Sequence, residues 1–235
     1  MTKRLVTFFQ TPGGGAESTG SWILVTGCLL TCSGDPDLSG IRGLRGEMMS
    51  MTIKEMNAKA VAELTDVINR IDPVQVDDLI ERLARANRVV VYGVGREGLM
   101  LKALAMRLFH MGLDAHVVGD MTTPPIGKGD VLVVSAGPGY FSTVAALMGV
   151  ARSAGAKTIC FTAQPEEKVP QSADLVVVLP AQTMADDTTG PTSFLPMGSL
   201  YEGVQYLFFE YLVLVLGDHM GITPEQMRAN HTNLE

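Results

Sequence analysis

Short, continuous apolar runs that alternate with helical patterns constrain the fold of this chain more than any other feature of its sequence. The segment 88–93 (RVVVYG) is one such run, rich in β-branched residues and closed by a glycine, as is typical of a strand buried on both faces. The alternation predicts an α/β fold, with a parallel sheet covered by helices on both faces. We expect strands at residues 88–93, 115–118, 131–135, 157–162 and 175–179.

Helix start signals surround these strands. Thr52 with Glu55 forms a capping box that opens a helix to about residue 70. Asp72-Pro73, with Gln75 at the third position, opens another to about residue 86. Further helices are expected at residues 98–111, 142–154 and 199–216, and from Thr223. Right-handed crossovers then bring the carboxyl ends of all strands to one edge of the sheet, where ligands of such folds bind.

The composition excludes several classes of protein. There are 18 Lys and Arg against 25 Asp and Glu, a net charge of −7, and no basic run, so nucleic acid is not an expected partner. The three scattered cysteines form no disulfide framework and favour a reducing, cytoplasmic setting. The four histidines show no metal-ligand spacing, so no metal site is expected.

Residues 1–50 differ from the rest of the chain. They are rich in glycine and show little periodicity, so we interpret them as a disordered extension or as the product of a translation start placed too early. Later starts are available at Met48, Met49 and Met51. A secretory or lipoprotein signal is rejected because the apolar core before Cys28 is too short. Residues 51–235 are expected to form one domain.

Two helices are unusually apolar. The run 207–216 is interrupted by Glu210 and falls short of the ~20 residues that a membrane span needs, so no membrane association is expected. This run and the helix at 98–111 are expected to lie in the core or at an interface between subunits. They also leave open a role as an oligomeric scaffold.

A glycine-rich first loop (residues 93–98, GVGREG) follows the first strand. Its G-x-G-x-x-G spacing, with Asp120 near the end of the next strand, permits a dinucleotide interpretation. Arg96 and Glu97 argue against it, because they place two long side chains where a pyrophosphate would approach. The alternatives are a tight turn that needs glycine and a loop whose N–H groups bind a small anion.

A second loop (residues 135–143, SAGPGYFST) follows the third strand. Ser142 and Thr143 are natural N-caps of the next helix. Alternatively, Ser135, the N–H groups of Gly137 and Gly139, and Thr143 hold phosphate or sugar oxygens. Because their strands are neighbours, the two loops are expected to form one pocket. Neither loop carries the Gly-Lys-Ser/Thr of a nucleotide-triphosphate site.

Two further groups are candidates for proton transfer. Ser199 with Glu202 reads as a capping box, but Glu202 also serves as a general base if burial raises its pKa more than the helix dipole lowers it. His231, near the carboxyl terminus, taken alone is simply an exposed histidine.

From about Thr52 to Glu235 the chain resembles the sugar isomerase (SIS) domain family, and within it most closely the 6-phospho-3-hexuloisomerases. The motifs that carry this resemblance are YGVGREGL (92–99), ALAMRL (103–108), TTPPIG (122–127), PMGSLYE (196–202) and NLE (233–235). The resemblance implies a five-stranded parallel sheet in a flavodoxin-like three-layer sandwich, and a homodimer or homotetramer. It also implies isomerisation of a sugar phosphate without a cofactor, from 3-hexulose 6-phosphate to fructose 6-phosphate.

The resemblance assigns roles to individual residues. Glu202 falls on the catalytic glutamate of the family, and His231 on a C-terminal histidine that opens the ring or moves a proton, in its own subunit or a neighbour's. A base at Glu202 would form a cis-enediol, with Arg96 or loop N–H groups stabilising the oxyanion. The expected substrate-binding residues are Gly93, Gly95, Arg96, Glu97, Ser135, Gly137, Gly139, Ser142 and Thr143.

Two departures from the family pattern leave the substrate open. Glu97 stands where the family has serine, and residues 136–140 replace a Ser-Gly-Ser-Gly-Glu/Asp pattern. A carboxylate facing phosphate is costly unless paired, and Arg96 or Lys102 is the expected partner of Glu97. The alternatives are therefore an isomerase of a different sugar, with or without a phosphate group, and a non-catalytic sensor of sugar phosphates.

Overall fold

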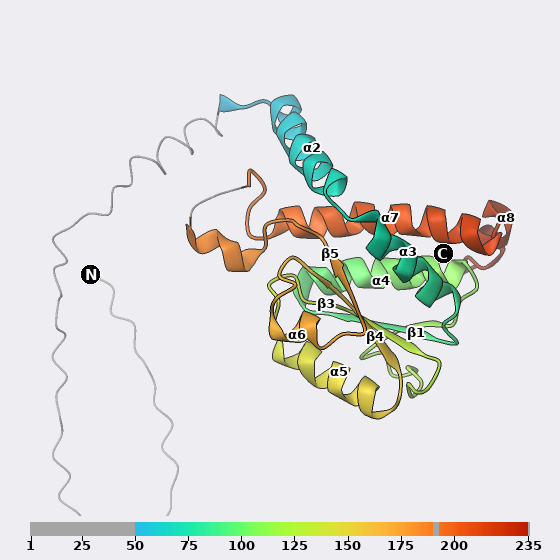
Figure 1. The fold of residues 1–235 in the computed structure, drawn as a ribbon. Coiled ribbons are helices and arrows are strands. Elements are labelled where there is room, and N and C mark those ends of the chain that lie inside the picture. Colours follow the sequence, from blue (N-terminus) through green and yellow to red (C-terminus); the bar gives the residue numbers. More distant parts are fainter. Residues whose placement is uncertain (1–49, 190–192, 235) are drawn as a thin grey trace, which may run out of the picture. The chain divides into compact units, whose positions relative to one another are not determined.

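A five-stranded parallel sheet is the centre of the unit formed by Met51–Glu235 (Figure 1). The computed structural model describes residues 50–189 and 193–234. Strand order is β2-β1-β3-β4-β5, and each neighbouring pair is parallel. The strands are β1 (Val89–Gly93), β2 (Ala115–Val117), β3 (Val131–Ser135), β4 (Lys157–Thr162) and β5 (Leu175–Val178). All five lie within the segments expected from the sequence, which confirms the α/β fold with its parallel sheet.

Helices cover both faces of this sheet, as the sequence predicts. The helices are α2 (Ile53–Asn69), α3 (Pro73–Ala84), α4 (Gly95–His110), α5 (Ser142–Ser153), α6 (Lys168–Gln171), α7 (Ser199–Met220) and α8 (Pro224–Ala229), with a 3-10 helix η1 (Met184–Thr189). Figure 1 shows α4 and α7 on one side of the sheet and α5 and α6 on the other. The sequence did not predict α6 and η1.

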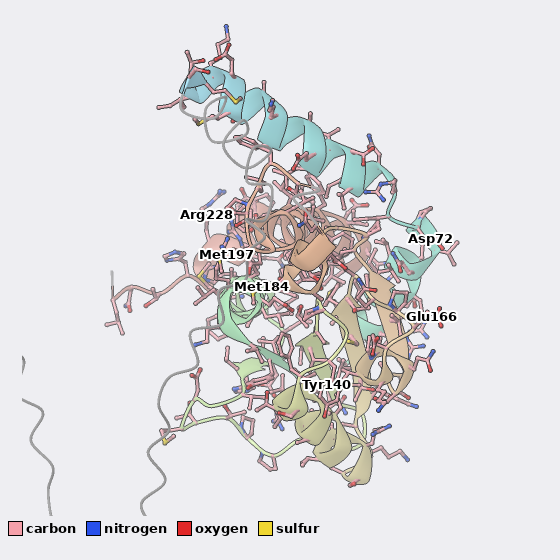
Figure 2. All side chains as sticks on the ribbon, turned by 90° about the vertical axis from the view of Figure 1, so that its left-hand side faces the viewer. Asp72, Tyr140, Glu166, Met184, Met197 and Arg228 are labelled. Carbon is pink, nitrogen blue, oxygen red and sulfur yellow. The ribbon has the colours of Figure 1, made fainter. Side chains whose placement is uncertain are left out.

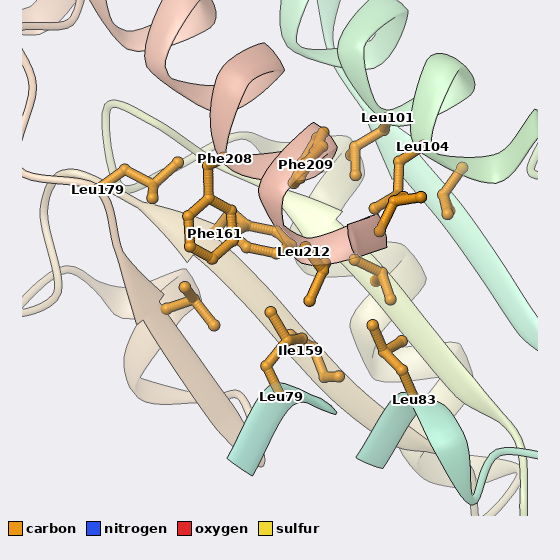
Figure 3. Close-up of a cluster of buried hydrophobic side chains, with 14 of the residues drawn as sticks. Leu79, Leu83, Leu101, Leu104, Ile159, Phe161, Leu179, Phe208, Phe209 and Leu212 are labelled. Carbon is orange, nitrogen blue, oxygen red and sulfur yellow. The ribbon is translucent and has the colours of Figure 1, made fainter. Parts of the chain in front are cut away.

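Alternation along each strand builds two separate cores. In β1, Val89 and Val91 face the larger core and Val90 the smaller one, because successive side chains of a strand point to opposite faces. Figure 3 shows the larger core, in which leucines of α3 and α4 meet aromatic residues of β4 and α7. The ring of Phe161 packs edge-on against Phe209, with 5.0 Å between ring centroids.

Local signals at the helix starts are only partly confirmed. The capping boxes at Thr52 and Thr223 form, and Asp72 caps α3. Gln75, however, exchanges two hydrogen bonds with the backbone of Val178 at 2.8 and 3.0 Å, and so ties α3 to the edge strand β5. The expected caps of α5 and α7 are wrong: the N-cap residues are Phe141 and Gly198, and neither provides a side-chain cap.

Among the described residues, α7 is long and apolar enough to cross a membrane by length and composition. Of its apolar window, 56% is buried against the rest of the fold, as in the core helix of a packed α/β domain. This observation is weak evidence for a membrane segment, and Figure 3 shows Phe208, Phe209 and Leu212 of α7 packed in the larger core.

Candidate functional site

The first and second loops lie side by side at the carboxyl edge of the sheet. Strands β1 and β3 are neighbours, and Gly93, the last residue of β1, pairs in register with Ser135, the last residue of β3. With the strand order β2-β1-β3, the connections leave this point in opposite directions, which makes it the switch point where open α/β sheets bind ligands. The expectation that the two loops meet is confirmed.

Glycines 93 and 98 of the first loop are needed for packing. A Cβ on Gly93 would stand 2.8 Å from the backbone nitrogen of Gly98, so the strand end and the helix start touch backbone to backbone. Gly95, by contrast, begins α4 with open space around it. Its neighbour Arg96 extends from the helix start with 56% of its side chain exposed.

Arg96 binds Glu202 across the gap between α4 and α7. One guanidinium nitrogen (Nη2) lies 2.8 Å from Glu202 Oε2, and the other (Nη1) donates a hydrogen bond to Ser199 Oγ at 3.1 Å. The ion pair is not aligned as a hydrogen bond, so the buried Oε2 has no hydrogen-bond partner among the described residues. Burial raises the pKa of Glu202 and the Arg96 charge opposes that rise, which favours a carboxylate that accepts a proton readily.

Glu97 lies beneath the second loop. Its Oε2 accepts a hydrogen bond from Ser135 Oγ at 2.5 Å and another from the Gly137 N–H at 2.9 Å. The Tyr201 hydroxyl lies 3.2 Å from the same Ser135 oxygen. Burial raises the pKa of Glu97, the two hydrogen bonds oppose that rise, and the nearby Glu202 adds to it. The expected pairing of Glu97 with Arg96 or Lys102 is wrong: Arg96 is engaged by Glu202, and Lys102 is exposed whereas Glu97 is buried under the second loop.

The second loop presents its hydroxyls at the start of α5. Ser142 and Thr143 are the first two residues of this helix and both are exposed. Because Phe141 provides no side-chain cap, the first N–H groups of α5 have no cap from that residue and can donate to an anion. Gly139 lies in the loop against Glu167, whose side chain would collide with a Cβ at this position.

Exposed apolar side chains surround this end of the protein. Tyr140, Met184 and Met197 are each more than half exposed, and Figure 2 looks onto the face on which they are labelled. Met197 has a left-handed φ of 53° next to Gly198, the N-cap of α7, a conformation that costs free energy and is typical of functional sites. These side chains can cover the apolar face of a bound sugar.

His231 lies at the other end of the domain. It follows α8, and its ring is 5.0 Å from that of His110, the last residue of α4. Glu202 belongs to the first turn of α7, and this 22-residue helix is about 33 Å long. Figure 1 shows the start of α7 and helix α8 at opposite ends. Within one chain, the structure therefore does not bring His231 and Glu202 together.

Tyr201 and Ser199 contact the site residues but were not expected there from the sequence. Tyr201 is fully buried against Ser135, and Ser199 accepts from Arg96 rather than capping α7. A cavity of about 450 Å³ between α2 and the start of α7 is lined by residues including Glu63, Arg70 and Leu200, and by none of the predicted site residues. Among the described residues, no group of three or more His, Cys, Asp or Glu could hold a metal ion.

Comparison with known proteins agrees with the geometry. A sequence profile of the SIS domain matches residues 82–201, half of the chain. The 3-hexulose-6-phosphate isomerase of Mycobacterium gastri is 39% identical over 173 residues, which cover 74% of this chain and 86% of that protein. The chain belongs to the SIS domain family. The 3-hexulose-6-phosphate isomerase of Bacillus subtilis is 32% identical, covering 79% of this chain and 100% of that protein.

The fold of this SIS domain is shared with solved structures. A hypothetical protein from Methanococcus jannaschii, whose structure is described as inferring a molecular function of 3-hexulose-6-phosphate isomerase, superposes with a TM-score of 0.66. It is 24% identical, and the match covers 76% of this chain and 98% of that chain. The match to the SIS domain and the isomerase relatives confirm the family resemblance, and the SIS domain match also confirms the predicted fold class.

Proposed function

We propose that this SIS domain protein is a sugar-phosphate isomerase that interconverts 3-hexulose 6-phosphate and fructose 6-phosphate. The observation that carries this proposal is the position of Glu202. Its carboxylate lies at the switch point of the sheet, with only 13% of the side chain exposed, and 2.8 Å from the guanidinium of Arg96. A largely buried base beside a fixed positive charge suits proton abstraction next to a carbonyl group. The isomerases named above are relatives over most of the chain.

The reaction uses one base and one stabilised oxyanion. Glu202 removes the proton from C2 of the 3-hexulose, the C2–H electron pair forms the C2–C3 double bond, and the C3 carbonyl oxygen becomes the oxyanion of a cis-enediolate. Arg96 stabilises this oxyanion while the hydroxyl proton passes from O2 to O3. The electrons then restore a carbonyl group at C2, and Glu202 returns its proton to C3, which gives the 2-ketose.

The phosphate group requires donors at the same edge of the sheet. We assign this role to the hydroxyls of Ser142 and Thr143 and to the N–H groups at the start of α5, which are exposed and uncapped by Phe141. Gly95 of the first loop has open space around it and allows the sugar to approach the backbone closely, whereas Gly93 permits the tight packing against Gly98 that positions this loop. The remaining candidates, Ser135, Gly137 and Gly139, shape the second loop.

His231 is proposed to act in the site of another copy of the chain. In its own subunit it is separated from Glu202 by the length of α7. Exposed apolar side chains on the outer faces of α4 and α7 are suited to bury such an interface in a homodimer or homotetramer. They are Leu99, Met106, Phe109, Tyr206, Tyr211, Leu214 and Val215.

Residues 51–235 are proposed to form the SIS domain, acting in the cytoplasm. Cys160 is a free, buried cysteine, as expected for a protein of a reducing compartment. The proposed disorder or later start of residues 1–50 concerns residues that, apart from Ser50, lie outside the described part of the chain. A sensor that binds a sugar phosphate without isomerising it is the competing function.

Substitution of Glu202 distinguishes the two functions. Glu202→Gln keeps the size of the side chain and removes the base, so kcat is expected to fall at least about 100-fold, the lower end of general-base catalysis. Glu225→Gln is the matched control, because Glu225 also lies in the first turn of a helix and pairs with an arginine, Arg228, but is exposed. Turnover of fructose 6-phosphate that is unaffected by Glu202→Gln, or absent in the wild type, would contradict the proposal.

A further inference from the structure

The carboxylate of Glu97 takes up hydrogen-bond donors that point to the carboxyl edge of the sheet. Ser135 Oγ and the Gly137 N–H both bond to its Oε2. Ser135 is the last residue of β3 and Gly137 lies two residues farther along, at the edge where donors of an α/β sheet meet a ligand. An anion that approached this part of the loop would find both donors engaged by the protein itself.

The fit around Glu97 leaves no room for a second anion. A Cβ added to Gly137 would stand 2.9 Å from Glu97 Oε1 and 2.9 Å from the ring of Tyr201. Glu97 is 8% exposed, Tyr201 1% and Ser135 not at all. The carboxylate is thus packed between the second loop and α7, and it keeps the donors occupied whether or not it carries a proton.

Acidic side chains also border the rest of the loop. Glu167 lies against Gly139, and Asp186 accepts a hydrogen bond from Gln164, which itself borders Gly139. Together with Glu97 they make this part of the loop unfavourable for a phosphate dianion, because like charges in a partly desolvated site repel.

We propose that Glu97 is a specificity-determining residue. Its carboxylate occupies the hydrogen-bond donors of Ser135 and Gly137, which an anionic group of a ligand would otherwise bind. That part of the second loop then faces a neutral, hydroxyl-bearing portion of the sugar, and the phosphate binds only farther along, at the start of α5. The inference rests on the proposed function for the presence of a sugar phosphate at this edge, but it concerns which donors the phosphate reaches.

Inorganic phosphate tests this inference without turnover. Glu97→Ser frees both donors and adds a hydroxyl, whereas Glu97→Gln keeps a side chain of the same size and shape beneath the loop. At constant ionic strength, calorimetry is expected to show that Glu97→Ser binds inorganic phosphate at least about tenfold more tightly than the wild type, the scale of one hydrogen bond to a charged group. The affinity of Glu97→Gln for inorganic phosphate is expected to increase less than that of Glu97→Ser.

Backbone NMR of the wild-type protein provides an independent readout if Glu97→Ser does not fold. Addition of inorganic phosphate is expected to shift the amide resonances of Ser142 and Thr143 and to leave that of Gly137 unchanged. A shifted Gly137 amide in the wild type, or a folded Glu97→Ser variant without gain in affinity, would overturn the inference. Neither readout depends on catalysis, so a protein that fails to isomerise any sugar refutes the proposed function and leaves this test valid.

Discussion

Gln205 offers a sharp test of the packing of α7 behind the site. Its side chain is fully buried, and neither its amide nitrogen nor its amide oxygen has a hydrogen-bond partner among the described residues. An unpaired buried polar group costs about 1–3 kcal/mol. Gln205→Met keeps an unbranched chain of similar length and removes both polar atoms. Imperfect packing of the methionine side chain costs less than about 1.5 kcal/mol, so we expect the free energy of unfolding to rise by about 1 kcal/mol.

Gln75→Met is the matched control for this substitution. The Gln75 amide makes two hydrogen bonds to the backbone of Val178, so the same change leaves a donor and an acceptor of β5 unpaired and costs about 1–3 kcal/mol. For a domain of this size, 1 kcal/mol corresponds to about 2–4 °C in Tm. Calorimetry at equal protein concentration is therefore expected to show a higher Tm for Gln205→Met and a lower Tm for Gln75→Met.

The directions of the two Tm changes show whether the amide of Gln205 is unpaired. If Gln205→Met lowers Tm as Gln75→Met does, the amide of Gln205 is hydrogen-bonded in solution, to a bound water or to another subunit. The interpretation that the buried amide of Gln205, one turn after Tyr201 in α7, has no hydrogen-bond partner would then be wrong.

Three further predictions concern the site. Gly137→Ala is expected to lower stability by about 1–3 kcal/mol by overpacking, because the added Cβ would press on Glu97 and Tyr201. Thermal unfolding measures this effect. The control is Gly149→Ala, which should be neutral or stabilising because Gly149 has open space around it. Burial raises the pKa of Glu97 in the folded state above the usual 4.5, so the folded state binds more protons than the unfolded state and the ionisation of Glu97 lowers stability as pH rises above 4.5. The difference in Tm between Glu97→Gln and wild type should therefore increase between about pH 4 and 8. A difference in Tm that stays constant over this range would contradict the prediction. Mixing and reassembling inactive Glu202→Gln and His231→Ala proteins should restore part of the activity if the two groups act across a subunit boundary, whereas two groups acting in one subunit would give no such recovery.

The fold could be predicted because its main signal is local. A strand such as Val89–Gly93 is apolar along its whole length since it is buried on both faces, and glycine marks its end. The placement of both loops at one edge followed from the parallel direction of the strands, which brings their carboxyl ends together.

The site could be predicted less completely, because its contacts join distant residues. Ser199 with Glu202 reads locally as a capping box, yet Ser199 instead accepts from Arg96, 103 residues earlier in the chain. The hydrogen bond between the Glu97 carboxylate and Ser135, 38 residues later in the chain, depends on the strand register that pairs Gly93 with Ser135. The sequence carries no local mark of either contact.

Exchange of substrate hydrogen with solvent tests the central claim, proton transfer by Glu202, most directly. Fructose 6-phosphate is incubated in deuterated water with wild type, Glu202→Gln or Glu225→Gln, and the deuterium at C3 is measured by mass spectrometry and NMR. The account predicts label with wild type and Glu225→Gln and at least about 100-fold slower labelling with Glu202→Gln. Equal labelling by Glu202→Gln and wild type would contradict it.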